Sequence, residues 1–131
     1  MKERIEFDWL GDQQLLLVRV EINGETELRM ALDTGATQTT FDLNMLLMEG
    51  ISLRESIGRQ ALETANGIIM ADIFVLDELQ FGGMKFQNLP VQVIDFIAHG
   101  VFSDYNGYLG LDVLSQKNLC IHFADGFLTF Q

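Results

Sequence analysis

The sequence predicts an all-β fold, a small barrel or sandwich of short strands with one or two short helices. Three observations lead to this prediction. Apolar and polar residues alternate over several short stretches, which is typical of strands with one buried face. Turn dipeptides that contain glycine separate these stretches at short intervals. The chain has a single proline and few stretches with helical periodicity.

The size and charge of the chain limit what it can be. Its 131 residues suffice for one core and are marginal for two, so we expect a single domain over residues 1–131. The net charge of -11 disfavours nucleic acid and anionic membranes as partners. No apolar stretch approaches the ~20 residues of a membrane helix, and the N-terminal stretch carries acids where a secretion signal is apolar. With Cys120 as the single cysteine, we expect a cytoplasmic protein without an internal disulfide.

The first two strands are expected within residues 15–32. They flank Asn23-Gly24, the strongest short hairpin signal, because both residues tolerate positive φ. Apolar side chains alternate with charged ones along both stretches, so one face of the hairpin should be buried. The second strand ends at Asp33, and Gly35 permits a tight turn directly after it.

The remaining elements follow from capping and turn signals. Asp42 is placed to N-cap a short helix over residues 43–49, which Gly50 would end. A second short helix is expected over residues 111–118. Turn dipeptides divide the rest of the chain into strands. They are Asn66-Gly67, Gly82-Gly83, Asn106-Gly107 and Asp125-Gly126, and we expect hairpins at the first and the last of these four.

The stretch around Asp33, Met-Ala-Leu-Asp-Thr-Gly-Ala-Thr, has two interpretations. An aspartate in a turn commonly bonds its own backbone, and such an Asx-turn is purely structural. The alternative is a functional carboxylate at the end of a rigid strand, surrounded by hydroxyls that bond the backbone. For an Asp-Thr-Gly taken alone the Asx-turn is the commoner outcome, so the residues that flank Asp33 have to decide between the two.

Residues 30–41 resemble the active-site signature of aspartic peptidases, in which Asp-Thr-Gly-Ala follows an apolar strand. The matching residues are Asp33, Thr34, Gly35 and Ala36. The resemblance implies that Asp33 is catalytic and that Thr34 bonds across a dimer. It also implies that Gly35 contacts the carboxylates through its backbone.

Two further stretches resemble the same family in the same order. Tyr108, Leu109 and Gly110 match the apolar-apolar-Gly segment that packs beneath the Asp-Thr-Gly loop. The hairpin tip stands where the family has its flap, and consists of Ala65, Asn66 and Gly67. This order covers nearly the whole chain and is similar to that of single-domain, retropepsin-like aspartic peptidases. The resemblance implies a closed β-barrel or sandwich lobe with a flap hairpin.

The number of motifs predicts the assembly. Pepsin-type enzymes carry two Asp-Thr/Ser-Gly motifs, whereas this chain has one. A catalytic pair therefore requires Asp33 of a second copy, which a two-fold homodimer supplies. We expect hydrolysis of peptide or protein substrates by a water that the paired carboxylates activate, without a cofactor. A catalytically silent retropepsin-like module for dimerisation or peptide binding is the alternative.

Other chemistries fit the sequence less well. Cys120 and His122 share one face of a predicted strand, but zinc needs three or four ligands and His99 is the only other imidazole, so we expect no metal. The Gly-x-Ser-x-Gly elbow of serine hydrolases is absent from the sequence. The Asp-Thr-Gly-Ala-Thr stretch weakly resembles the phosphorylated loop of haloacid-dehalogenase-like enzymes. That fold requires alternating helices, which the pattern does not predict.

Overall fold

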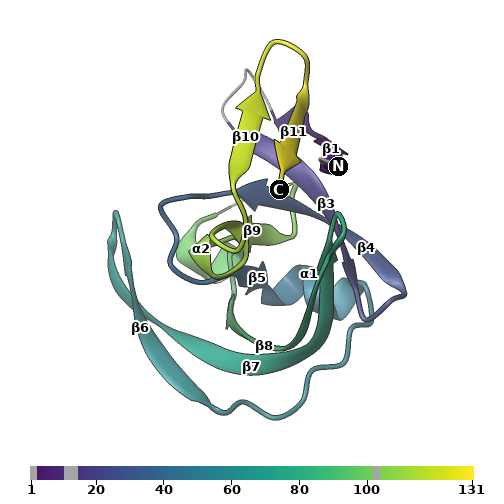
Figure 1. The fold of residues 1–131 in the computed structure, drawn as a ribbon. Coiled ribbons are helices and arrows are strands. Elements are labelled where there is room, and N and C mark those ends of the chain that lie inside the picture. Colours follow the sequence, from purple (N-terminus) through teal and green to yellow (C-terminus); the bar gives the residue numbers. More distant parts are fainter. Residues whose placement is uncertain (1–2, 11–14, 102–103) are drawn as a thin grey trace.

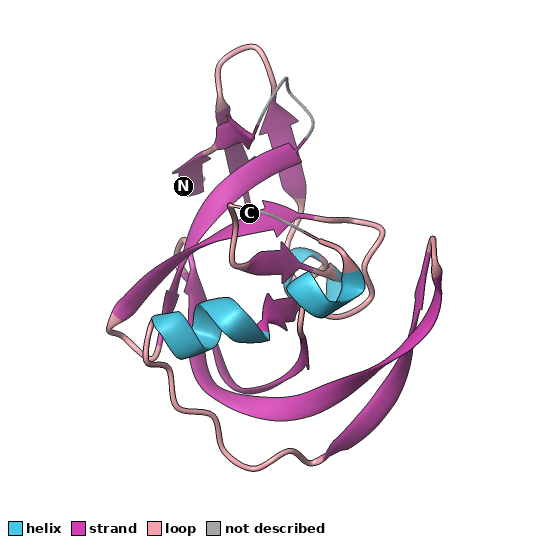
Figure 2. Cartoon of the chain, turned by 180° about the vertical axis from the view of Figure 1, so that it is seen from behind, coloured by secondary structure: helices cyan, strands magenta, loops and turns pink. Residues whose placement is uncertain are grey.

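The structure, a computed structural model, describes residues 3–10, 15–101 and 104–131 (Figure 1). Strands make up most of it, and the helices are short (Figure 2). The strands are β1 (Glu3–Glu6), β2 (Asp8–Leu10), β3 (Leu15–Ile22), β4 (Thr26–Leu32), β5 (Thr40–Asp42), β6 (Gly58–Thr64), β7 (Gly67–Phe81), β8 (Met84–Ile94), β9 (Gly107–Leu109), β10 (Leu119–His122) and β11 (Phe127–Phe130). The helices are α1 (Leu43–Met48), the 3₁₀ helix η1 (Ile97–His99) and α2 (Leu111–Leu114). Among the described residues, none of these helices is long and apolar enough to cross a membrane.

Six strands close into a barrel. The larger sheet has the order β2-β3-β4-β9-β5-β8-β7-β6, and β3 also pairs with β7 at Glu21–Gln80 and Ile22–Leu79. This additional pairing joins the two ends of the series β3-β4-β9-β5-β8-β7. The predicted all-β fold, a closed barrel with short helices, is therefore confirmed.

Alternating side chains fill the barrel. On β3, Val18, Val20 and Ile22 are buried, whereas Arg19 and Glu21 face solvent. Each large apolar side chain that leaves water contributes roughly 1.5–3 kcal/mol to folding. The alternation predicted from the sequence thus determines which face of the strand points into the core.

The β6–β7 ribbon extends beyond the barrel. Residues 51–57 form no regular structure and lead into β6, which pairs only with β7 among the described strands. The ribbon curves around one side of the barrel, and its free tip lies across from α2 (Figure 1). On the opposite side from this curve, β10 and β11 form a small sheet with β1 (Figure 1).

Most of the predicted turns are confirmed. Asn23 and Gly24 have φ values of 54° and 68° and connect β3 to β4. The dipeptides at 66–67, 82–83 and 125–126 likewise join neighbouring antiparallel strands. The helix after Asp42 is also confirmed, since the Asp42 carboxylate accepts the Asn44 amide and Gly50 follows the helix with a φ of 68°.

The turn predicted at Asn106-Gly107 is wrong at the glycine. Gly107 begins β9, which lies parallel to β4 and antiparallel to β5. A Cβ atom at Gly107 would lie 2.1 Å from the carbonyl oxygen of Thr40. The glycine is therefore required by the close approach of two strands and does not form a hairpin turn. The helix predicted over residues 111–118 is also shorter, since α2 ends at Leu114.

Candidate active site

Asp33 lies directly after β4, at the point where the strand leaves the barrel. Its backbone amide donates to the carbonyl of Leu109 on β9 (3.1 Å), which holds the start of the loop. Its carboxylate Oδ1 accepts the amide of Gly35 (2.9 Å), and its carbonyl accepts the amide of Ala36 (3.2 Å). The Asp33 side chain is half-buried, and Thr34 is exposed at the tip of the turn. The loop thus fixes a carboxylate that solvent can still reach.

A second segment, the β9–α2 loop, packs against the first. It runs from Tyr108 and Leu109 at the end of β9 through Gly110 into α2. The amide of Leu111 donates to the carbonyl of Ala36 (2.8 Å) just beyond this segment. A Cβ atom at Gly110 would lie 2.7 Å from the carbonyl carbon of Gln38 and 2.9 Å from the Ala36 oxygen. Only glycine fits at this crossing without moving the Asp33 loop.

Asp112 ties the two loops together. Its carboxylate accepts the backbone amide of Thr39 (3.0 and 3.1 Å), the Thr39 hydroxyl (2.7 Å) and the amide of Val113 (2.9 Å). The Thr39 hydroxyl in turn accepts the amide of Gly110 (3.2 Å). Sequence reasoning counted Thr39 among the hydroxyls near Asp33 but missed Asp112 as its partner. An acidic residue in the first turn of a short helix after glycine was the one available signal.

The predicted hairpin tip forms the turn between β6 and β7. Ala65 and Asn66 are its central residues, and Gly67 begins β7. The Thr64 hydroxyl accepts the Asn66 amide (3.2 Å) and donates to the Gly67 carbonyl (2.7 Å). All three tip residues are exposed. The turn is therefore closed by its own residues and leaves its outer surface open to solvent.

A cavity of about 320 Å³ lies between the Asp33 loop and the flank of this hairpin. Its lining comprises Gly35, Ala36, Thr37, Gln38, Gln60, Ala61, Leu62, Glu63, Gln92 and Tyr108. The structure thus brings Gly35, Ala36 and Tyr108 together with the β6 strand. The tip residues Ala65, Asn66 and Gly67 are not part of this lining.

Two tyrosines lie near enough to Asp33 for its charge to affect their pKa values. Burial raises the pKa of Tyr105, and the charges of Tyr108 and Asp33 raise it further. Burial also raises the pKa of Tyr108, a hydrogen bond with Thr40 lowers it, and the Asp33 charge raises it. Both rings pack on Phe96: the ring centroids of Tyr105 and Tyr108 lie 6.2 and 6.3 Å from that of Phe96. The phenols therefore stay protonated and neutral at physiological pH.

The histidines and the cysteine lie outside this site. Cys120 and His122 are on β10 of the small sheet, where the His122 ring stacks on Phe127. His99 belongs to η1. Within the described residues, no three His, Cys, Asp or Glu side chains lie together as metal ligands would.

Comparisons with known proteins bear on the family. Residues 18–113, which include both loops and the hairpin, match the family described as aspartyl protease. The chain belongs to the aspartyl protease family. Among solved structures, this member of the family is similar to a retropepsin-like aspartic protease from Rickettsia conorii, with a TM-score of 0.67 and 18% identity. The likeness covers 99% of this chain and 89% of that one, and at this identity it establishes a retropepsin-like fold. A search of curated proteins found no match.

Proposed function

We propose that the chain is a homodimeric aspartic endopeptidase. It hydrolyses peptide bonds with a water molecule that two Asp33 carboxylates activate, one from each subunit. The observation that carries this proposal is the presentation of Asp33: a half-buried carboxylate at the end of β4, held by the Gly35 amide beside a cavity. Membership of the aspartyl protease family supports the same reading.

The need for a partner follows from the carboxylates near the site. Asp112 is the other carboxylate of the two packed loops, and its oxygens are already bonded to Thr39 and Val113. It points into the contact between the loops, so it is not available to a substrate. A second Asp33, related by a two-fold axis, supplies the missing acid. Thr34, exposed at the tip of the turn, is suitably placed to bond to the partner's loop.

The chemistry follows from two neighbouring carboxylates. Both cannot be charged without strong repulsion, so the pair holds one proton. The charged Asp33 removes a proton from the water as it attacks the scissile carbonyl, while the protonated Asp33 donates to the carbonyl oxygen. The tetrahedral intermediate then collapses. The amine leaves with a proton from the first carboxyl group, and a hydroxyl group of the intermediate returns its proton to the second carboxylate. No covalent bond to the enzyme forms.

The β6–β7 hairpin fits the role of a flap over an extended peptide. β6 lies at the end of the sheet order, so one edge of its backbone faces no strand among the described residues. An extended peptide can add to such an edge through main-chain hydrogen bonds. Peptides and unfolded protein segments are accordingly the proposed substrates, with the tip at Ala65, Asn66 and Gly67 closing over them.

The test is peptide cleavage by concentrated protein, with the products sequenced by mass spectrometry. Asp33→Asn should lower the rate by ~10³-fold or more, because it removes the general base. Asp125→Asn, in an exposed turn, is the matched control and should retain activity. A statine-type inhibitor should block the parent chain. If the parent sediments as a dimer and cleaves nothing, the silent binding module becomes the better account.

A further inference from the structure

We propose that the cavity beside the Asp33 loop is a side-chain subsite that selects a carboxamide, the side chain of glutamine or asparagine, in the bound peptide. This inference rests on the proposed endopeptidase function and names its substrate class. It starts from three carboxamides that separate elements bring to one cavity. Gln38 comes from the Asp33 loop, Gln60 from β6 and Gln92 from β8.

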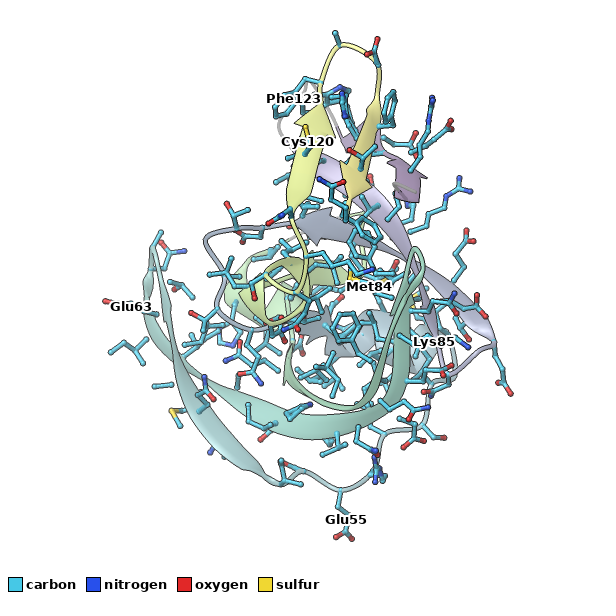
Figure 3. All side chains as sticks on the ribbon, viewed as in Figure 1. Glu55, Glu63, Met84, Lys85, Cys120 and Phe123 are labelled. Atoms are coloured by element: carbon cyan, nitrogen blue, oxygen red, sulfur yellow. The ribbon has the colours of Figure 1, made fainter. Side chains whose placement is uncertain are left out.

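The cavity wall is polar but carries almost no charge. Glu63 is its only charged lining residue, and it contributes from the outer face of the hairpin. Glu63 pairs with the exposed Ile68 across the ribbon, and Figure 3 shows its side chain directed away from the barrel. Gln60, Ala61 and the half-buried Leu62 therefore form the wall on the hairpin side.

Gln92 provides a free donor. It is 2% exposed, and its Oε1 accepts the hydroxyl of Thr40 (2.9 Å). Its Nε2 donates to none of the described residues. Every fully buried side-chain nitrogen or oxygen of the described residues has a hydrogen-bond partner. Since this Nε2 has none, it is not fully buried, and we infer that it faces the cavity that Gln92 lines.

Gln38 provides a free acceptor. Its Nε2 donates to the carbonyl of Pro90 (3.2 Å), which orients the amide and leaves Oε1 available. One donor from Gln92 and one acceptor from Gln38 are complementary to a primary carboxamide, which accepts through oxygen and donates through nitrogen. A glutamine or asparagine side chain can satisfy both groups at once.

Other side chains fit this cavity less well. An apolar side chain would displace water from the Gln92 amide without replacing its hydrogen bond, and buried unpaired donors are unfavourable. An acidic side chain would meet the field of Asp33 and of a chain with net charge -11. A cationic side chain would be attracted by that field, but it has only donors and cannot accept the hydrogen bond of Gln92 Nε2.

The substitution Gln92→Met tests the donor. Methionine keeps an unbranched side chain of similar length but lacks the amide. Thr40 keeps an acceptor, because its hydroxyl also lies 3.2 Å from the carbonyl oxygen of Gln38. Gln87→Met, at an exposed position of the same strand β8, is the matched control. Circular dichroism and thermal unfolding check that both variants fold.

The first experiment sequences the products after a random peptide mixture is cleaved by each protein. In the parent and in Gln87→Met, Gln and Asn should be enriched about 10-fold over Met and Leu at one position relative to the cleaved bond. In Gln92→Met this enrichment should disappear. Cleavage without Gln or Asn enrichment, or with enrichment that Gln92→Met leaves unchanged, overturns the subsite and leaves the peptidase standing.

The second experiment does not depend on cleavage. Immobilised Asp33→Asn protein, with and without Gln92→Met, retains peptides from the same mixture, and the bound peptides are sequenced. If Gln and Asn are enriched among the bound peptides and Gln92→Met removes this enrichment, the subsite is supported. This holds even if the parent cleaves nothing, in which case only the peptidase proposal fails. Retention of no peptides, or of apolar ones alone, overturns the subsite.

Discussion

Replacing Asp112 by alanine should destabilise the chain, because this carboxylate joins the Asp33 loop to α2. The substitution removes the acceptor of the Thr39 amide and of the Thr39 hydroxyl. Thr39 is fully buried, so its amide would be left without a partner. The Val113 amide is less affected, since it also donates to the Gly110 carbonyl (3.1 Å).

The size of the effect follows from these contacts. An orphaned buried donor costs about 1–3 kcal/mol, and a hydrogen bond to a charged group contributes about 1.5–3 kcal/mol. Asp112 is half-buried, so water replaces part of what the carboxylate provided. We therefore expect Asp112→Ala to lower the free energy of unfolding by about 2–3 kcal/mol. Asp112→Asn, which keeps one acceptor oxygen, should lose less than the alanine variant.

The assay is urea unfolding followed by circular dichroism at one fixed protein concentration. Asp77→Ala is the matched control, because Asp77 makes one exposed ion pair with Arg54 (3.0 Å). Such pairs contribute about 0–1 kcal/mol. If Asp112→Ala and Asp77→Ala unfold at the same urea concentration, the carboxylate does not hold the two loops and the reasoning is refuted.

Three further predictions address the close packing, the pH dependence and the assembly. Gly110→Ala should lower the free energy of unfolding in urea by more than about 2 kcal/mol, because the new Cβ would lie 2.7 Å from a backbone atom. Gly58→Ala, with open space around the new Cβ, should change that free energy little. A hydrogen bond from the Ala98 amide lowers the pKa of Asp95, so its stabilising contribution is present above the unfolded pKa and is lost as pH falls through the lowered value. In Asp95→Asn, the urea concentration at half-unfolding should therefore fall less steeply as the pH is lowered than it does in the parent. The same dependence on pH in both proteins would contradict this. If two Asp33 residues form the site, specific activity should fall on dilution, and concentration-independent activity from a sedimenting monomer would oppose it.

The hairpins could be predicted because their signals are local. Asn23 and Gly24 both adopt positive φ, which their own residue types allow, and the flanking strands alternate in polarity. The helix cap at Asp42 involves an amide only two residues away. Neither feature depends on knowing which distant segment lies beside it.

The order of strands in the barrel could not be predicted in this way. β9 inserts between β4 and β5, and β5 lies parallel to β8. These pairings join segments that are far apart in the chain. The sequence shows a glycine at position 107 but not which strands lie beside it. The same glycine that suggests a turn is needed here because Thr40 approaches to within 2.1 Å of its would-be Cβ.

The same difference in range explains why the sequence singled out the Asp33 motif but not Asp112 or Gln92. The carboxylate and carbonyl of Asp33 bond to the amides of Gly35 and Ala36, so the motif carries its own geometry in four consecutive residues. Asp112 acquires its role from Thr39, 73 residues earlier, and Gln92 from a threonine 52 residues earlier. Their contacts exist only after the barrel has closed and the strands around the Asp33 loop have brought these polar groups together. A short motif can therefore single out a candidate carboxylate, whereas the groups that hold it and shape its cavity become visible only with the fold.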